Sequence, residues 1–412
     1  MKNTSIKRLA AFLSANILMQ LFGAISGILL ARWMEVDEYA LYTIMTMVSG
    51  AMIILTKGGV NLGLNAYLGQ MWPDKVRCSE ALSYALSVRK KIALLSLPMI
   101  LLITGWLLYE NGATPVNIAL LLALLCLNFI CDFHSRLYDQ ILNFANRANE
   151  IQWWDSIFAA TRLTLYLFMK ALGMLNVFSA VLIAYIALGL RVFPVRKKVN
   201  EEINVVEYRG DEYSKIKTIA KRQFPIEVFN VLQAQLILIL IAQFGEPENT
   251  AAFGAMTRLG QLFLPLTSLL NAYIIPRFCV MEKDSAIRVF TIWSCLSAVP
   301  GLFLCSFALV KPELLLLIVG DNYSNYTTEV FWVAIFFLLK STSIFMWQLL
   351  ANIGRNRFVY LQIPLFSAWC IFSICYIDLK EFLGILIFQL GFPVVVAITS
   401  IVEFYIYKTK IH

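Results

Sequence analysis

The chain has 412 residues, of which 59% are hydrophobic and only 15% are charged, whereas soluble domains carry about 25% charged residues. So few charges cannot cover a soluble fold of this size, and the composition therefore favours a chain that lies largely in lipid. The net charge of +8 does not indicate a nucleic-acid partner, because the basic residues are spread between apolar runs rather than gathered in one region.

Apolar stretches of about 20 residues, each long enough to cross a hydrocarbon core of about 30 Å, recur along the whole chain. In lipid they form helices, because an open strand would leave backbone groups without hydrogen-bond partners. The first stretch is too long for a signal-peptide core and lacks a small-x-small cleavage site, so we expect it to be retained. We predict about twelve membrane-spanning helices, at 9–31, 39–56, 92–109, 115–131, 151–169, 172–190, 224–244, 251–275, 290–310, 330–350, 358–376 and 382–407.

The orientation of these helices follows from the Lys and Arg residues of the connections, because cytoplasmic loops carry an excess of both. With the N-terminus inside, 27 of them lie in segments predicted to be cytoplasmic. Four lie in external segments, at Arg32, Lys170, Lys311 and Lys380. Both termini are therefore predicted to be cytoplasmic.

The longest internal connection divides the predicted helices six and six. Its mixed charges suit a solvated, partly helical linker on the cytoplasmic surface. We expect an N-terminal lobe at 1–190, a cytoplasmic linker at 191–223 and a C-terminal lobe at 224–412.

The two halves also resemble each other. A shift of 211 positions aligns Ala31 with Ala242 and Met45 with Met256. Because both halves begin inside, such a repeat would be parallel, and it predicts two six-helix lobes around a central cavity.

Three cations fall inside the predicted membrane helices. Arg162, Arg258 and Lys340 lie well within their spans, where a charge costs about 2.5–3.5 kcal/mol on insertion scales and usually faces a polar cavity or a partner. We predict that they bind a phosphate-bearing substrate, since Arg supplies a bidentate fork and Lys a point charge. Structural alternatives stay open: a structural polar network with another helix for Arg162, snorkelling or an acidic partner for Lys340, and an ion pair for Arg258.

Acidic residues near the predicted cytoplasmic ends are candidates for ion coupling. Glu227 lies two residues after Pro225, and Asp155 lies near the start of the fifth predicted helix. The alternative for each is an ordinary interfacial residue. No nucleophile elbow, P-loop, metal-ligand spacing or paired-carboxylate motif is present in the sequence, so we predict no enzyme, no metal site and no cofactor.

Three stretches resemble one family. GAISGILLARWMEVDEYALYTIMTMVSG followed by GGVNLGLNAYLGQ resembles the opening of the polysaccharide exporters of the multidrug/oligosaccharidyl-lipid/polysaccharide superfamily, which includes the bacterial O-antigen flippases. AAFGAMTRLGQLFLPLTSLLNAYIIPRF resembles the eighth helix of that family, and LLLLIVGDNYSNYTTEVFWVAIF resembles its ninth-to-tenth connection. Arg258 matches an arginine that is often found in the eighth helix. The first helix, with no charge between Arg8 and Arg32, lacks the cations that some relatives carry there.

The resemblance implies twelve helices in two lobes and a transporter of the bacterial inner membrane. Its substrate would be an undecaprenyl-pyrophosphate-linked oligosaccharide, the O-antigen repeat unit of lipopolysaccharide biosynthesis. A flippase of this kind moves the unit from the cytoplasmic to the periplasmic leaflet by alternating access, and other polysaccharide-assembly membrane proteins would be its partners.

Two other functions stay open. A cation-coupled multidrug antiporter of the same superfamily commonly uses an acid in the first helix, and this first helix has none. A membrane glycan polymerase or ligase typically needs a long external loop, whereas the external connections predicted here are short.

Overall fold

The computed structural model describes residues 2–57, 59–145, 147–204, 206, 208, 213–261, 274, 278, 283–352 and 357–409. Within these residues the secondary structure is helical, and nine helices are long and apolar enough to cross a membrane. Helices satisfy their own backbone hydrogen bonds, which lipid cannot do for them. The predicted class, an all-α integral membrane protein, is confirmed.

Each of the first five predicted spans lies in a helix, and the sixth, predicted at 172–190, is helical from Val177 onward. The local sequence explains where several of these helices begin. Asp74 accepts hydrogen bonds from the first turn of α4, and Thr114 does the same for α5, which has Pro115 at its first position. Asn176 and Ser179 form a capping box at the start of α7. The helices are α1 (Lys2–Trp33), α2 (Val36–Lys57), α4 (Lys75–Glu110), α5 (Pro115–Phe144), α6 (Ala148–Ala171) and α7 (Val177–Glu202).

The second half of the chain also follows the predicted spans. The eighth span, predicted at 251–275, is covered by a helix as far as Gln261, and most of its remainder lies outside the described residues. The twelfth span is two consecutive helices rather than one. The helices are α8 (Ser214–Phe244), α9 (Pro247–Gln261), α11 (Lys283–Val310), α13 (Thr327–Asn352), α14 (Gln362–Tyr376), α15 (Phe382–Phe388) and α16 (Gly391–Thr409). A short apolar helix, α12 (Pro312–Val319), lies in the connection before α13.

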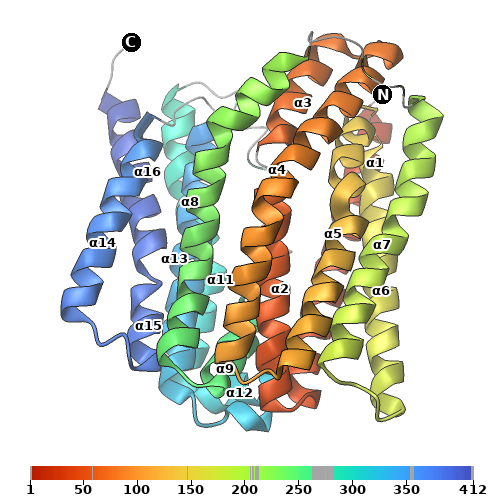
Figure 1. Cartoon of the computed structure of the whole chain (residues 1–412). Helices are drawn as coiled ribbons and strands as arrows, with labels where there is room; N and C mark the ends of the chain where they lie inside the picture. Colours follow the sequence, from red (N-terminus) through yellow and green to blue (C-terminus); the bar gives the residue numbers. More distant parts are fainter. Residues whose placement is uncertain are drawn as a thin grey trace. The chain divides into compact units, whose positions relative to one another are not determined.

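Helix α4 is much longer than the span predicted at 92–109. It is one helix of 36 residues, drawn without a break in Figure 1. At 1.5 Å per residue it is about 54 Å long, so it exceeds the hydrocarbon core of about 30 Å. Its first half packs with α3 (Val60–Met71) on the side predicted to face the cytoplasm, in an apolar cluster that includes Leu64, Leu82 and Tyr213.

The predicted linker at 191–223 is helical at both ends, because α7 continues to Glu202 and α8 begins at Ser214. Between them the chain is attached to α4. Ser79 Oγ donates to the carbonyl oxygen of Asn204 and accepts from the N–H of Val206, both at 2.6 Å. The part of this connection that the structure describes is therefore bound to α4 rather than free in solvent.

By their contacts the residues form two compact units. The N-terminal unit comprises Met1–Ser26 and Trp33–Ile239, and the C-terminal unit comprises Gly27–Arg32 and Leu240–His412. The division falls within α1 and near the end of α8. The lobe boundaries predicted from the linker stay a prediction.

Candidate functional site

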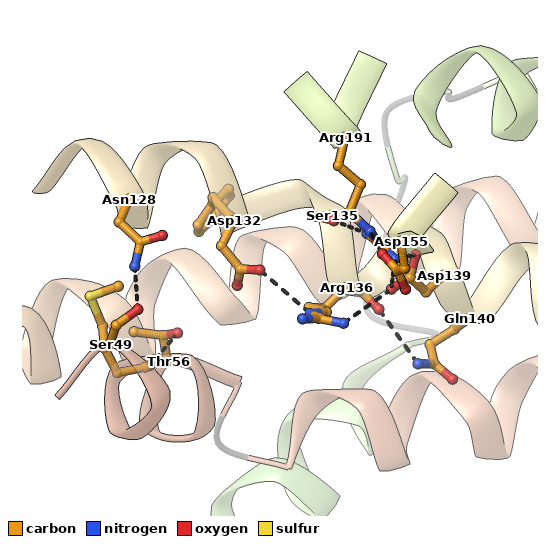
Figure 2. A network of polar contacts seen from close by, with 12 residues as sticks. Ser49, Thr56, Asn128, Asp132, Ser135, Arg136, Asp139, Gln140, Asp155 and Arg191 are labelled. Atoms are coloured by element: carbon orange, nitrogen blue, oxygen red, sulfur yellow. Dashed lines mark hydrogen bonds and ion pairs between the residues drawn. The ribbon is translucent and has the colours of Figure 1, made fainter. Parts of the chain in front are cut away.

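The N-terminal unit holds a group of charged side chains on four helices, which we call the charge network. Figure 2 shows most of its members converging from α5, α6 and α7. The apolar runs of these helices make such charges costly unless they meet partners of opposite sign. The members are Arg89 on α4, Asp132, Arg136 and Asp139 on α5, Asp155 on α6 and Arg191 on α7.

Arg89 joins α4 to α5. Its Nη2 lies 3.0 Å from Oδ2 of Asp132, with both side chains almost fully buried. Its Nη1 donates to the backbone carbonyl oxygens of Asp132 and Phe133, and the guanidinium lies 5.2 Å from the centre of the Phe133 ring. The pair is therefore neutral as a whole and rich in hydrogen bonds, as buried ion pairs need to be.

Arg191 joins three helices. Its Nη2 lies 3.0 Å from Oδ1 of Asp139 on α5, and its Nε donates to Oδ1 of Asp155 on α6. Its Nη1 donates to the hydroxyl of Ser135. The planar fork of an arginine suits this arrangement because it can reach several acceptors at once.

Arg136 connects the two parts of the network and is held more loosely. Its Nε lies 3.6 Å from Oδ1 of Asp132, and its Nη1 lies 3.8 Å from Oδ2 of Asp139. The side chain keeps 35% of its surface exposed. With this third arginine the network has three positive and three negative groups, so its charges balance.

A hydrogen bond near the charge network joins α5 to α2. The Asn128 amide, one turn before Asp132, donates to the hydroxyl of Ser49 on α2 at 2.6 Å (Figure 2).

The two acids predicted as coupling candidates both belong to the N-terminal unit. Asp155 is held by Arg191. Glu227 lies half-buried on α8. A coupling role for either acid stays a prediction.

Arg162, the predicted cation of this unit, lies on α6 against α1. Its Nη2 is 3.6 Å from the position that a Cβ atom of Gly23 would take. Its Nε is buried and has no hydrogen-bond partner within the described residues. A buried donor of this kind costs free energy until a ligand or water satisfies it.

The other two predicted cations belong to the C-terminal unit. Arg258 lies on α9, where its Nη1 donates to Oε1 of Gln261 at 3.4 Å. Lys340 is half-buried on α13, with its Nζ 5.2 Å from the centre of the Phe336 ring. Among the described residues, Lys340 has no carboxylate partner. The structure thus places each predicted cation on a helix within an apolar segment, and their role in substrate binding stays a prediction.

The charge network was missed by the sequence analysis, which ended the fourth span at residue 131. A signal was present. Asp132, Arg136 and Asp139 are spaced by four and three residues, which puts them on one face of a helix. Charges at that spacing directly after an apolar run indicate that the helix continues with a buried polar face.

A second set of ion pairs lies at the surface, beyond the apolar part of the helices. Arg147 donates to Glu150 at 2.6 Å and to Glu201 at 2.9 Å, and Lys198 lies 3.1 Å from Glu201. The hydrogen bond to the Glu150 carboxylate raises the pKa of Arg147 above its usual range. These contacts join the start of α6 to the end of α7.

Comparison with known proteins finds the fold but not the family. No protein-family model matches the sequence, and no curated protein matches it either. A multidrug-resistance transporter of the MATE family, described as a member of the MOP superfamily and solved inward-facing, aligns with 97% of this chain and 97% of its own, with 13% identity and a TM-score of 0.70. The lipid II flippase MurJ, solved in an inward closed conformation, aligns with 97% of this chain and 87% of its own, with 12% identity and a TM-score of 0.68.

The fold is that of MATE and MurJ. An outward-facing MATE transporter of the same superfamily gives a TM-score of 0.61 with 14% identity, over 98% of this chain and 94% of its own. These neighbours are transporters and a flippase. At these identities the likeness establishes the architecture, and the substrate has to be argued from the residues of this chain.

Proposed function

We propose that this protein is a flippase that moves an undecaprenyl-pyrophosphate-linked oligosaccharide, such as an O-antigen repeat unit, from the cytoplasmic to the periplasmic leaflet of a bacterial inner membrane. The observation that carries the proposal is the imbalance of its buried charges. Lys340 has no carboxylate partner among the described residues, and Arg162 has a buried Nε without a hydrogen-bond partner there.

The buried acids point the same way. Asp132, Asp139 and Asp155 are each paired with an arginine of the charge network. Helix α1 contains no acidic residue. These three carboxylates are thus already neutralised by arginines of the same unit. Cations without acidic partners favour an anionic substrate.

A pyrophosphate is the group for which such cations matter most. Moving it through hydrocarbon without replacing its water would be prohibitive, because charged groups lose a large hydration free energy. Guanidinium and ammonium groups can replace that water with charge-assisted hydrogen bonds, while the prenyl chain stays in lipid. Of the three cations we assign the main contact to Arg258, with Arg162 and Lys340 as further contacts, each within its own unit.

Reconstituted protein tests the proposal directly. A fluorescent undecaprenyl-pyrophosphate-linked oligosaccharide is placed in proteoliposomes, and the rate at which inner-leaflet label becomes accessible to dithionite measures flipping. A charge-assisted hydrogen bond contributes about 1.5–3 kcal/mol, so Arg258→Ala should slow flipping roughly 10- to 100-fold. Arg258→Lys should retain part of the rate, and Arg77→Ala, which changes an exposed arginine of α4, should retain all of it.

Two outcomes would overturn the proposal. Full flipping by Arg258→Ala would remove this residue from the mechanism. Efflux of a cationic dye by the same proteoliposomes, with no flipping of the pyrophosphate lipid, would support the multidrug antiporter instead.

The coupling candidate needs its own measurement. If Glu227 carries protons, Glu227→Gln should abolish the stimulation of flipping by an imposed proton gradient while basal flipping continues. An unchanged gradient dependence would discard Glu227 as a coupling residue.

A further inference from the structure

Helix α1 carries two glycines one turn apart, and each of them faces an arginine that we assign to substrate binding. Gly23 lies against Arg162 within the N-terminal unit, and Gly27 lies against Arg258 within the C-terminal unit. Residues four apart lie on the same face of a helix. The two positions therefore look alike in the sequence, but their surroundings differ.

At Gly27 the arginine occupies the space of the missing side chain. A Cβ atom there would lie 2.7 Å from Cδ, 3.0 Å from Nε and 3.4 Å from Cγ of Arg258. These distances are well inside the optimum of about 3.5–4.0 Å for non-bonded carbon atoms. The aliphatic part of Arg258 thus lies directly on the backbone of α1.

At Gly23 the contact is an ordinary one. A Cβ atom would lie 3.6 Å from Nη2 of Arg162, the nearest of its neighbours. Alanine would fit there without any displacement. Gly23 is thus a natural control for Gly27, because both lie in the interior of the same helix and share the same helical face.

A glycine within a helix is costly unless something requires it. Glycine is less favourable than alanine by about 1 kcal/mol in a helix interior. At Gly27 the close approach of Arg258 supplies the requirement, since any larger residue would push the arginine away. Gly27 therefore makes α1 less stable than alanine would, and in return it leaves room for the Arg258 side chain.

The two ends of the Arg258 side chain are held by different helices. Its Cγ, Cδ and Nε lie against Gly27 of α1, and its Nη1 donates to Gln261 on α9. A side chain fixed in this way loses less conformational entropy when it binds an anion, because part of its freedom is already lost. The orientation of the guanidinium fork then depends on α1 as well as on its own helix.

We propose that Gly27 is a positioning residue. Because it has no side chain, Arg258 can pack against α1, and this contact between Gly27 and Arg258, which we call the seat, fixes the direction of the guanidinium group. The seat is a structural feature, and its effect on transport rests on the proposed function. Gly27 does not touch the substrate and acts only through Arg258.

A double-mutant cycle separates the seat from the function. Purified variants Gly27→Ala, Gly23→Ala and Gly50→Ala are compared by apparent melting temperature, each with Arg258 and with Arg258→Ala. Gly50 lies on α2 with no atom near its Cβ position, so it reports helix propensity alone. We expect Gly27→Ala to melt below the two controls when Arg258 is present, and to melt with them when Arg258 is replaced by alanine.

The second readout is flipping of the labelled pyrophosphate lipid as a function of its concentration. Gly27→Ala should raise the half-saturating concentration by roughly tenfold, as a misplaced charge-assisted contact would, whereas the two controls should stay within about twofold of the native protein. In the Arg258→Ala background, Gly27→Ala should cause no further loss.

The outcomes distinguish the two hypotheses. Equal melting of Gly27→Ala and Gly23→Ala with Arg258 present would overturn the seat. A coupled melting effect with no pyrophosphate-lipid flipping by any variant, the native protein included, would leave the seat in place and reject the proposed function. A Gly27→Ala loss that persists unchanged without Arg258 would show that Gly27 acts through another contact, and would overturn the positioning role.

Discussion

Arg89 and Arg191 of the N-terminal unit have neighbours of a different kind from those of Lys340 in the C-terminal unit. In the N-terminal unit, Arg89 and Arg191 are almost fully buried and are bonded to aspartates on neighbouring helices. In the C-terminal unit, the described core around α11, α13 and α16 is apolar and aromatic, with the rings of Phe290 and Phe404 stacked at 4.1 Å. Lys340 of that unit has an aromatic neighbour, Phe336, and no acidic one among the described residues.

This difference teaches that an intramembrane charge is not by itself a functional residue. Where opposite charges meet, as at Arg191, the ion pairs connect neighbouring helices of the protein. Where a cation lacks an acid among the described residues, as at Lys340, no ion pair offsets the cost of burial. The sign balance of the surroundings separates the two cases better than depth in the membrane does.

The largest effect that would test this comparison is expected at Arg191. Arg191→Ala leaves Asp139 and Asp155 as uncompensated carboxylates, and breaking a buried pair in this way costs about 3–5 kcal/mol. The apparent melting temperature and the yield of folded protein should both fall strongly. The triple variant Arg191→Met, Asp139→Asn, Asp155→Asn should recover part of the loss. Unchanged melting of Arg191→Ala would mean that the network does not stabilise the unit.

A smaller loss is expected outside the membrane part of the same unit, at Ser79. Ser79→Ala removes the hydroxyl that bonds both Asn204 and Val206, which should cost about 1–3 kcal/mol because backbone groups lose their partner. Faster cleavage of the connection between α7 and α8 in limited proteolysis would reveal it. Ser83→Ala removes a single bond, to the carbonyl of Val206, and should have a weaker effect. Equal cleavage rates for the native protein and Ser79→Ala would contradict the attachment.

The surface ion pairs should matter less again. Lys198 lies 3.1 Å from Glu201 and 3.8 Å from Glu150, and all three side chains are substantially exposed. Such pairs contribute about 0–1 kcal/mol. Lys198→Gln should therefore lower the melting temperature slightly at low salt and not at all at high salt, where the charges are screened. A large loss that persists at high salt would contradict the view that Lys198 contributes only through exposed ion pairs.

The smallest effect on stability is expected at Lys340, and it is the sharpest test of the comparison. Lys340→Met removes a cation without an acidic partner among the described residues, so melting should be unchanged or slightly higher. Flipping of the pyrophosphate lipid should nevertheless fall. A strong loss of stability would place Lys340 with Arg191 as a structural charge.

Most of the helices could be predicted because lipid restricts a membrane-spanning chain to helices, and apolar runs of about 20 residues mark where they lie. The ends of the helices were harder to predict, because a helix can continue beyond its apolar part and the hydropathy pattern marks only the apolar part. The span predicted from residue 92 lies in a helix that begins at Lys75. The span predicted to end at residue 131 lies in a helix that continues to Phe144.

The candidate site could be predicted only in part. The sequence marks Arg162, Arg258 and Lys340 because each interrupts an apolar run. It does not reveal that Asp155 meets Arg191, since partners on different helices have no fixed spacing along the chain. The contact of Gly27 with Arg258 is hidden for the same reason, because Gly23 lies one turn earlier on the same helical face and has a different neighbour.

The attachment of the α7–α8 connection to α4 has a practical consequence for labelling. A long polar connection in a membrane protein is the usual place to insert an epitope or a fluorophore. Here an insertion next to Asn204 or Val206 would disturb the hydrogen bonds that both residues make with the Ser79 hydroxyl. It would also displace Tyr208, whose ring packs edge-to-face against Tyr84. The turn at Gly112, with a positive φ and open space around it, offers a site on the opposite end of α4 that leaves these contacts intact.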